Sequence, residues 1–154
     1  MEMTKILRPE AVRILSAASS KKRLFHELGG IAETVYGLSQ PKAVEALQER
    51  ENLGPTGVGS GVALPHARLP GLDHVVGAMV VIESPIDFEA PDRQPVDLAF
   101  ALFAPEDAGV EHLKALALVS RTLRNQSICA KLRANNDPAT LFTILTEGES
   151  VRAA

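Results

Sequence analysis

Two uninterrupted apolar segments limit what this chain can fold into. Residues 75–82 and residues 98–104 consist of aliphatic, aromatic and small side chains, with proline, glycine or aspartate close to their ends. A helix that crosses a bilayer needs about 20 apolar residues, so neither segment is long enough to span a membrane. Apolar runs of this length without alternation are typical of strands that are covered on both faces. We therefore predict two buried strands within a sheet and no membrane insertion.

Helical patterns precede these strands. Residues 9–18 carry apolar side chains at helical spacing, and the pattern continues through residues 24–28 after Ser20, which predicts two short helices. A third helix is predicted to begin at Ser39 and to end at Gly54, because serine is a common N-cap and glycine a common stop.

Helical patterns also follow the strands. After Pro105, a predicted helix carries one apolar stripe formed by His112, Leu116, Val119 and Leu123. A last helix is predicted to begin at Asp137 and Pro138, since aspartate caps a helix and proline fits its first turn.

Strands that lie between two sets of helices indicate an α/β fold. We predict a single-domain α/β/α sandwich with a mixed β-sheet flanked by helices on both sides. A chain of 154 residues has the length of one ordinary domain. The domain is predicted to span residues 4–148, followed by a disordered tail at residues 149–154.

Composition excludes several classes of protein. The formal net charge is −3, and the nearest approach to a basic cluster is residues 21–23, which we interpret as the solvated face of a helix. Aromatic residues make up 4% of the chain, so the basic and aromatic surface of a nucleic-acid-binding protein is not expected. The single cysteine, Cys129, cannot form an internal disulfide, and residues 1–8 lack a long apolar core. These features predict a cytoplasmic protein.

Glycines alternate just before a Pro-His pair. Gly57, Gly59 and Gly61 remove side chains from an extended segment, so backbone N–H groups could approach phosphate oxygens, although a tight turn or bulge is the simpler interpretation. The segment lacks the Gly-Lys-Ser/Thr of a phosphate-binding loop and runs into Pro65 instead of a helix, which argues against nucleotide binding. Pro65 favours extended backbone and places His66 at a strand end.

Five short motifs follow one another along the chain. They are Thr-Gly-Val-Gly-Ser-Gly-Val-Ala-Leu-Pro-His at 56–66, Pro-Ile-Asp-Phe at 85–88, Gln-Pro-Val-Asp-Leu at 94–98, Phe-Ala-Leu-Phe at 100–103 and His-Leu-Lys-Ala-Leu-Ala at 112–117. In this order the chain resembles the enzyme IIA family of the bacterial phosphotransferase system. The resemblance is to the mannitol/fructose type, and most closely to its nitrogen-regulatory branch.

The resemblance implies an active site. His66 corresponds to the family's phosphorylated histidine, His112 to its second active-site residue, and Arg50 to an arginine that supports the site. Ser60 stands where sugar-specific relatives can carry an acidic residue. The implied protein is a phosphohistidine carrier rather than a free-standing enzyme, and it accepts its phosphoryl group from an HPr-like phosphocarrier protein. The chemistry is consistent, because a neutral imidazole is a nucleophile at cytosolic pH and requires no cofactor or metal.

Three functions remain open at this point. In the favoured one, the phosphorylation state of His66 regulates other proteins. In the second, the domain passes its phosphoryl group to a IIB domain during sugar uptake. In the third, His66 and His112 bind a metal ion, which ranks last because no third ligand is evident near them.

The surroundings of the site also carry expectations. His26 and His74 are predicted to lie on the surface. The carboxylates Glu51, Asp97 and Glu111 could orient an imidazole, but carboxylates near a helix or strand end are more often solvated, so no role is assigned to them. Next to His66, an apolar surface that could dock a partner is expected from Val62, Leu64, Pro65 and Leu69.

Overall fold

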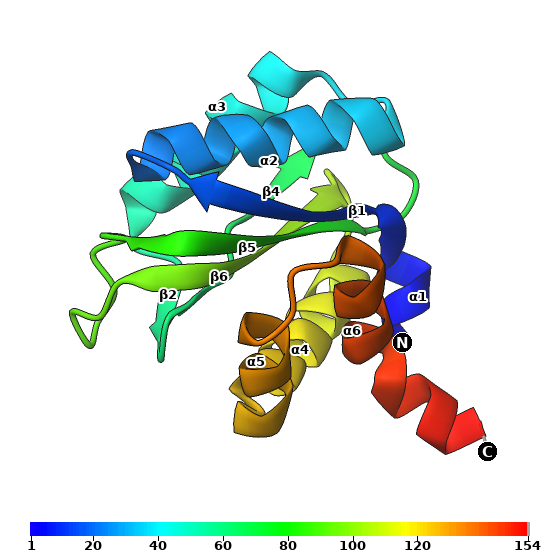
Figure 1. Ribbon diagram of the computed structural model, residues 1–154. Coiled ribbons are helices and arrows are strands. Elements are labelled where there is room, and N and C mark those ends of the chain that lie inside the picture. Colours follow the sequence, from blue (N-terminus) through cyan, green and yellow to red (C-terminus); the bar gives the residue numbers. More distant parts are fainter. Residues whose placement is uncertain (154) are drawn as a thin grey trace.

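The computed structural model describes the backbone of residues 1–153 and the side chains of residues 1–147. In chain order the elements are α1 (Met3–Ile6), β1 (Leu7–Ala17), α2 (Lys21–Tyr36), α3 (Gln40–Leu53), β2 (Gly57–Gly59), β3 (Val62–Ala63), β4 (His66–Leu69), β5 (Val76–Ile86), β6 (Val96–Pro105), α4 (Val110–Arg124), α5 (Gln126–Arg133) and α6 (Pro138–Ala153). Helices α2 and α3 cover one face of the sheet, and α4, α5 and α6 cover the other (Figure 1). The predicted α/β/α sandwich is confirmed.

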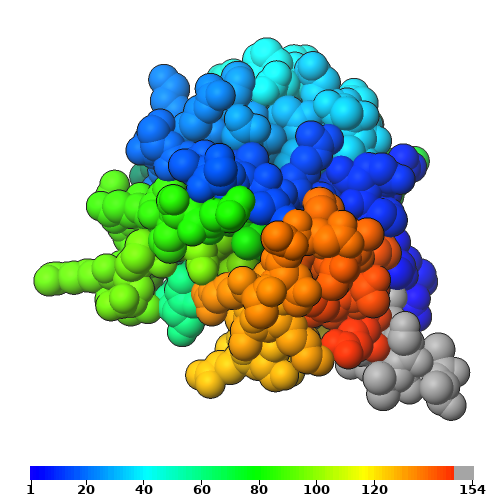
Figure 2. Space-filling model, in the orientation of Figure 1, coloured from blue at the N-terminus to red at the C-terminus, as the bar shows by residue number. Residues whose placement is uncertain are grey.

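One mixed sheet forms the middle layer. Its strand order is β1-β5-β6-β3-β2, and β4 also pairs with β6. Every residue of β6 except Asp97 is buried, and so is the first part of β5, which confirms the two central strands. Gly77 is needed at their contact, because a Cβ there would lie 2.6 Å from Cε1 of Phe100. Figure 2 shows α2 and α3 in blue and cyan on one side and α5 with the first part of α6 in orange on the opposite side.

The helix predicted at residues 9–18 is wrong, because this segment is strand β1. The strand lies at the edge of the sheet and pairs in parallel with β5. Its register is irregular between Leu7 and Val12, so buried residues do not alternate strictly along it. Pro9 falls within the irregular part, where an edge strand tolerates a missing N–H. The three-residue spacing of Val12 and Leu15 therefore resembled the apolar spacing of a helix.

The other predicted helices are confirmed, and their ends follow the expected chemistry. The hydroxyl of Ser20 accepts from the N–H of Arg23 at the start of α2, and α3 begins after Ser39 and ends at Gly54. Helix α5 was missed from the sequence. Its N-cap is Asn125, whose side chain accepts from two backbone N–H groups of the first turn.

The ends of the domain stay a prediction. The expected tail at residues 149–154 overlaps the last turns of α6 up to residue 153, and the side chains of residues 148–154 lie outside the described residues. Among the described helices, none combines the length and apolar character that a membrane crossing requires.

Candidate functional site

The alternating glycines form a tight hairpin between β2 and β3. Gly59, Ser60 and Gly61 all have positive φ angles, of 94°, 57° and 80°. The N–H of Ser60 donates to Asp92 at 2.8 Å, so this turn amide is already satisfied. Arg133 donates to the Ser60 carbonyl and to both oxygens of the Asp97 carboxylate, each at 2.8 Å. The turn interpretation of the glycines is confirmed, and the hairpin is fastened to α5 and β6.

His66 is the first residue of β4, as predicted for a strand end. It pairs opposite Leu102 of β6, and the carbonyl of the preceding Pro65 accepts from the N–H of Leu102 at 3.0 Å. Pro65 itself is buried, whereas His66 is half-buried. The backbone on both sides of the ring is therefore held by the central strand, which leaves the imidazole at a fixed place on the surface.

The hydrogen bonds of the His66 ring identify its free nitrogen. Nδ1 lies 2.8 Å from the carbonyl oxygen of Leu64. Since a carbonyl only accepts, this bond requires a proton on Nδ1, and the lone pair of the neutral ring is then on Nε2. Arg50 Nε donates to that nitrogen at 3.3 Å, and Arg50 Nη1 donates to the Gly54 carbonyl at 2.9 Å. The structure thus brings Arg50 to the unprotonated nitrogen of His66.

His112 reaches the same place from the first turn of α4. Its ring meets that of His66 edge to face, with 5.5 Å between the centroids. His112 is 8% exposed, and its Nε2 is buried without a hydrogen-bond partner among the residues that the structure describes. Buried polar atoms are normally paired, so an unpaired one next to a candidate nucleophile points to a ligand that completes it.

The site favours uncharged imidazoles. Burial lowers the pKa of His66, and the nearby Arg50 charge lowers it further, whereas the Leu64 carbonyl and Glu51 act in the opposite direction. Burial also lowers the pKa of His112, with further contributions from His66 and Arg68. Both rings are therefore neutral at neutral pH, the form in which His66 can act as a nucleophile.

We expect the folded protein to show His66 titrating below the ordinary histidine value of about 6.5. Because the folded pKa is lowered, the lone pair on Nε2 stays available at pH 6.5 and is lost only as the pH falls through the lowered value. An NMR titration of the ring measures this midpoint, with the urea-unfolded chain as reference. A folded midpoint at or above that of the unfolded chain would contradict the electrostatics described above.

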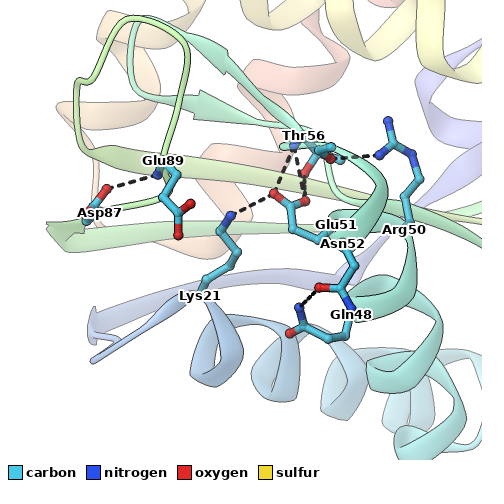
Figure 3. A network of polar contacts seen from close by, with 9 residues as sticks. Lys21, Gln48, Arg50, Glu51, Asn52, Thr56, Asp87 and Glu89 are labelled. Carbon is cyan, nitrogen blue, oxygen red and sulfur yellow. Dashed lines mark hydrogen bonds and ion pairs between the residues drawn. The ribbon is translucent and has the colours of Figure 1, made fainter.

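The burial and bonding of a carboxylate beside the site, Glu51, were missed from the sequence. Glu51 accepts from the N–H and the hydroxyl of Thr56 and from Nζ of Lys21 (Figure 3). Lys21 also lies over the ring of Phe88, so its interpretation as part of a solvated helix face is wrong. The signal for Glu51 was its spacing from Ala43 and Leu47, which places it on the inward face of α3.

Arg68 was also missed. It follows His66 by two residues on β4, so the two side chains share one face of the strand. The Arg68 guanidinium donates to the carbonyl of Glu106 at 3.0 Å and lowers the pKa of His112. Because alternate residues of a strand share one face, counting two residues on from His66 would have identified Arg68. Arg50 and Arg68 make the surroundings of the two imidazoles positive.

The residues predicted to form an apolar docking surface beside His66 do not form one. The side chains predicted for it, Val62, Leu64, Pro65 and Leu69, are all buried. Exposed apolar side chains lie instead on the elements that carry Arg50 and His112, and on the hairpin. They are Leu53, Val58, Val110 and Leu113, with exposed fractions from 57% to 85%.

Several other features of the structure do not belong to the His66 site. His26 and His74 are exposed, as predicted. A cavity of about 700 Å³ lies between the hairpin and α4–α5, and His66 is not among its lining residues. Within residues 1–147, no group of three or more histidine, cysteine, aspartate or glutamate side chains is arranged to hold a metal ion.

Comparison with known proteins identifies the family. A family model described as the phosphoenolpyruvate-dependent sugar phosphotransferase system, EIIA 2, matches residues 5–148. The chain belongs to this family. As an EIIA 2 protein it is 45% identical over 145 residues to a nitrogen regulatory protein of Bradyrhizobium diazoefficiens, an alignment that covers 94% of this chain and 95% of the relative.

Solved structures agree with this assignment. The crystal structure of the nitrogen regulatory protein IIA-Ntr from Neisseria meningitidis superposes with a TM-score of 0.83 at 38% identity, covering 92% of this chain and 97% of the other. The crystal structure of IIA mannitol from Escherichia coli superposes with a TM-score of 0.70 at 20% identity, covering 86% and 95%. The second comparison supports the EIIA fold alone.

Proposed function

We propose that this EIIA 2 protein accepts a phosphoryl group on Nε2 of His66 from a phosphorylated HPr-like protein and regulates other proteins according to its phosphorylation state. The observation that carries the proposal is the hydrogen-bond pattern of His66. Its Nδ1–H is bound to the Leu64 carbonyl, and its Nε2 lone pair faces Arg50. A ring in this tautomer is ready to attack phosphorus through Nε2.

The transfer step balances without a base. The lone pair of Nε2 forms the new N–P bond, while the bond between phosphorus and the donor atom breaks and its electron pair leaves with the donor. The proton stays on Nδ1, hydrogen-bonded to the Leu64 carbonyl, so no proton has to leave His66 during the step. The remaining tasks are to position the phosphoryl group and to neutralise its charge.

Arg50 and His112 suit these tasks. The Arg50 bond to Nε2 is long for a hydrogen bond, at 3.3 Å, and a guanidinium carries five N–H donors. We infer that Arg50 shifts from Nε2 to the phosphoryl oxygens as the N–P bond forms. The unpaired Nε2 of His112 would contribute a second donor, which gives this buried atom the partner that it lacks.

The regulatory role is supported by the names of relatives and by the surface around the site. Proteins similar over nearly their whole length are named nitrogen regulatory protein. Leu53 is an exposed apolar side chain on α3, the helix that carries Arg50. Val110 and Leu113 are exposed apolar side chains on α4, the helix that carries His112, as expected of a surface that docks another protein. A phosphoryl group on His66 would add negative charge at this surface and release partners that cover it with apolar or acidic groups.

We expect His66→Glu, a mimic of the negative charge, to bind regulatory partners roughly tenfold more weakly than the unphosphorylated wild type. His66→Ala should keep them. Quantitative affinity capture from lysate measures the difference, and His26→Glu on the exposed side of α2 is the charge-matched control.

Equal partner occupancy for all of these proteins would contradict regulation through His66. Transfer to a IIB domain during sugar uptake would then be the stronger function. Incubation of the phosphorylated protein with purified IIB domains would test that function directly.

A further inference from the structure

Glu51 is the most completely bonded carboxylate near the site. Its side chain is 3% exposed and accepts from Thr56 N at 3.0 Å, from Thr56 Oγ1 at 2.6 Å and from Lys21 Nζ at 3.0 Å. These contacts join the start of α2, the end of α3 and the chain just before β2 (Figure 3). A buried carboxylate is costly unless it is paired and hydrogen-bonded, so all of these contacts are needed to keep it there.

Backbone hydrogen bonds lead from this carboxylate to the His66 ring. The Thr56 carbonyl accepts from the N–H of Leu64 at 3.0 Å. The Leu64 carbonyl accepts from Nδ1 of His66 at 2.8 Å. Glu51 is therefore connected to the imidazole through two residues, each of which is held by a hydrogen bond on both sides.

Thr56 is the residue at which Glu51 restrains the backbone that leads to His66. Thr56 follows Gly54 and Pro55 and precedes the glycines of the hairpin, which leave the backbone after it with few side chains to restrict it. Glu51 binds both the N–H and the hydroxyl of Thr56, which fixes the backbone and the side chain of that residue together. A fixed Thr56 in turn holds the Leu64 peptide at the distance that the His66 proton requires.

We propose that Glu51 is a positioning residue that, through Thr56 and Leu64, keeps the proton of His66 on Nδ1 and so presents Nε2 as the nucleophile. Its consequence for phosphoryl transfer rests on the proposed function, whereas the position of the proton is a property of the unphosphorylated protein. Lys21 supports the arrangement by pairing with the Glu51 carboxylate, and Arg50 donates to Nε2, the other nitrogen of the His66 ring.

The test is the tautomer of His66, read from long-range ¹H–¹⁵N NMR spectra of the unphosphorylated protein. Glu51→Gln loses one acceptor for Thr56 and leaves Lys21 without its charge partner. We expect it to show a second ring tautomer with the proton on Nε2, and a rate of phosphoryl acceptance roughly tenfold below that of the wild type. Glu49→Gln, the same change at an exposed position of α3, should behave as the wild type.

A second pair of variants keeps the test decisive if Glu51→Gln does not fold. Thr56→Val retains the shape and the N–H but removes the hydroxyl bond, and should show the same change in smaller degree. Thr56→Ser keeps the hydroxyl and should restore the wild-type spectrum and rate.

Two different results separate this inference from the proposed function. If Glu51→Gln and Thr56→Val keep the proton entirely on Nδ1 while the wild type accepts a phosphoryl group, the inference is overturned and the proposed function stands. If the tautomer changes as expected but the wild type accepts no phosphoryl group, the proposed function fails and the positioning role of Glu51 stands.

Discussion

His66→Ala is expected to accept no phosphoryl group from a phosphorylated HPr-like protein. The variant lacks the nitrogen whose lone pair accepts a hydrogen bond from Arg50. It also loses the side-chain bonds to the Leu64 carbonyl and to the charged Arg50, a loss of about 1 kcal/mol and about 2 kcal/mol, so the domain should remain folded. The measurement is labelling by phosphoenolpyruvate, enzyme I and the HPr-like protein, followed by quantification of the bound label.

The control for this loss is His74→Ala, which removes a histidine from an exposed turn where it contacts only the neighbouring Asp73 among the polar contacts described. That variant should be labelled at the wild-type rate. The label on the wild type should be acid-labile, as phosphoramidates are. An acid-stable label, or full labelling of His66→Ala, would show that another residue is the acceptor.

Removal of His112 is expected to have the second largest effect. His112→Ala should accept the phosphoryl group roughly a hundredfold more slowly, the usual cost of losing one oriented donor in a transfer step. His112→Phe keeps an aromatic ring in the buried place but has no N–H, and should be similarly slow. The single-turnover rate at saturating donor measures the step separately from docking.

Lys114→Ala is the control for His112, because Lys114 is exposed on the same helix. It should react as fast as the wild type. If His112→Phe reacted at the wild-type rate, the ring of His112 would contribute packing alone. A slow His112→Ala would not change this conclusion, because the alanine variant also leaves a cavity.

The central layer could be predicted from the sequence because its physical signal is strong. Strand β6 and the first part of β5 are buried on both faces and form continuous apolar runs in the sequence. Strand β1 could not be predicted, since an edge strand with an irregular register needs no regular pattern of buried residues. Its pairing with β5 is a long-range contact, which local spacing does not report.

The candidate site was predictable only in part. Arg50, His66 and His112 come from α3, β4 and α4, and local patterns do not show that these elements meet; the family resemblance supplied that expectation. The resemblance carried no role for Glu51, and a carboxylate near a helix end is ordinarily solvated. Its spacing from Ala43 and Leu47 indicates an inward position on α3, but its bonds to Thr56 become visible only in three dimensions.

The docking surface was mispredicted for a related reason. Leu69 lies three residues after His66 and therefore faces the other side of β4, whereas Leu64 lies in the connection between β3 and β4, and both side chains are buried. The exposed apolar side chains belong to neighbouring elements, as Leu53 and Leu113 show. Proximity in sequence was therefore a poor guide to the surface that surrounds His66.

The most direct test of the central claim is to locate the phosphoryl group on the wild-type protein. After phosphorylation by the HPr-like donor, ³¹P and long-range ¹H–¹⁵N NMR identify the modified nitrogen. We predict one phosphoryl group per chain on Nε2 of His66, with the proton retained on Nδ1 against the Leu64 carbonyl. A phosphoryl group on Nδ1 of His66, or on any other residue, would contradict the mechanism described here.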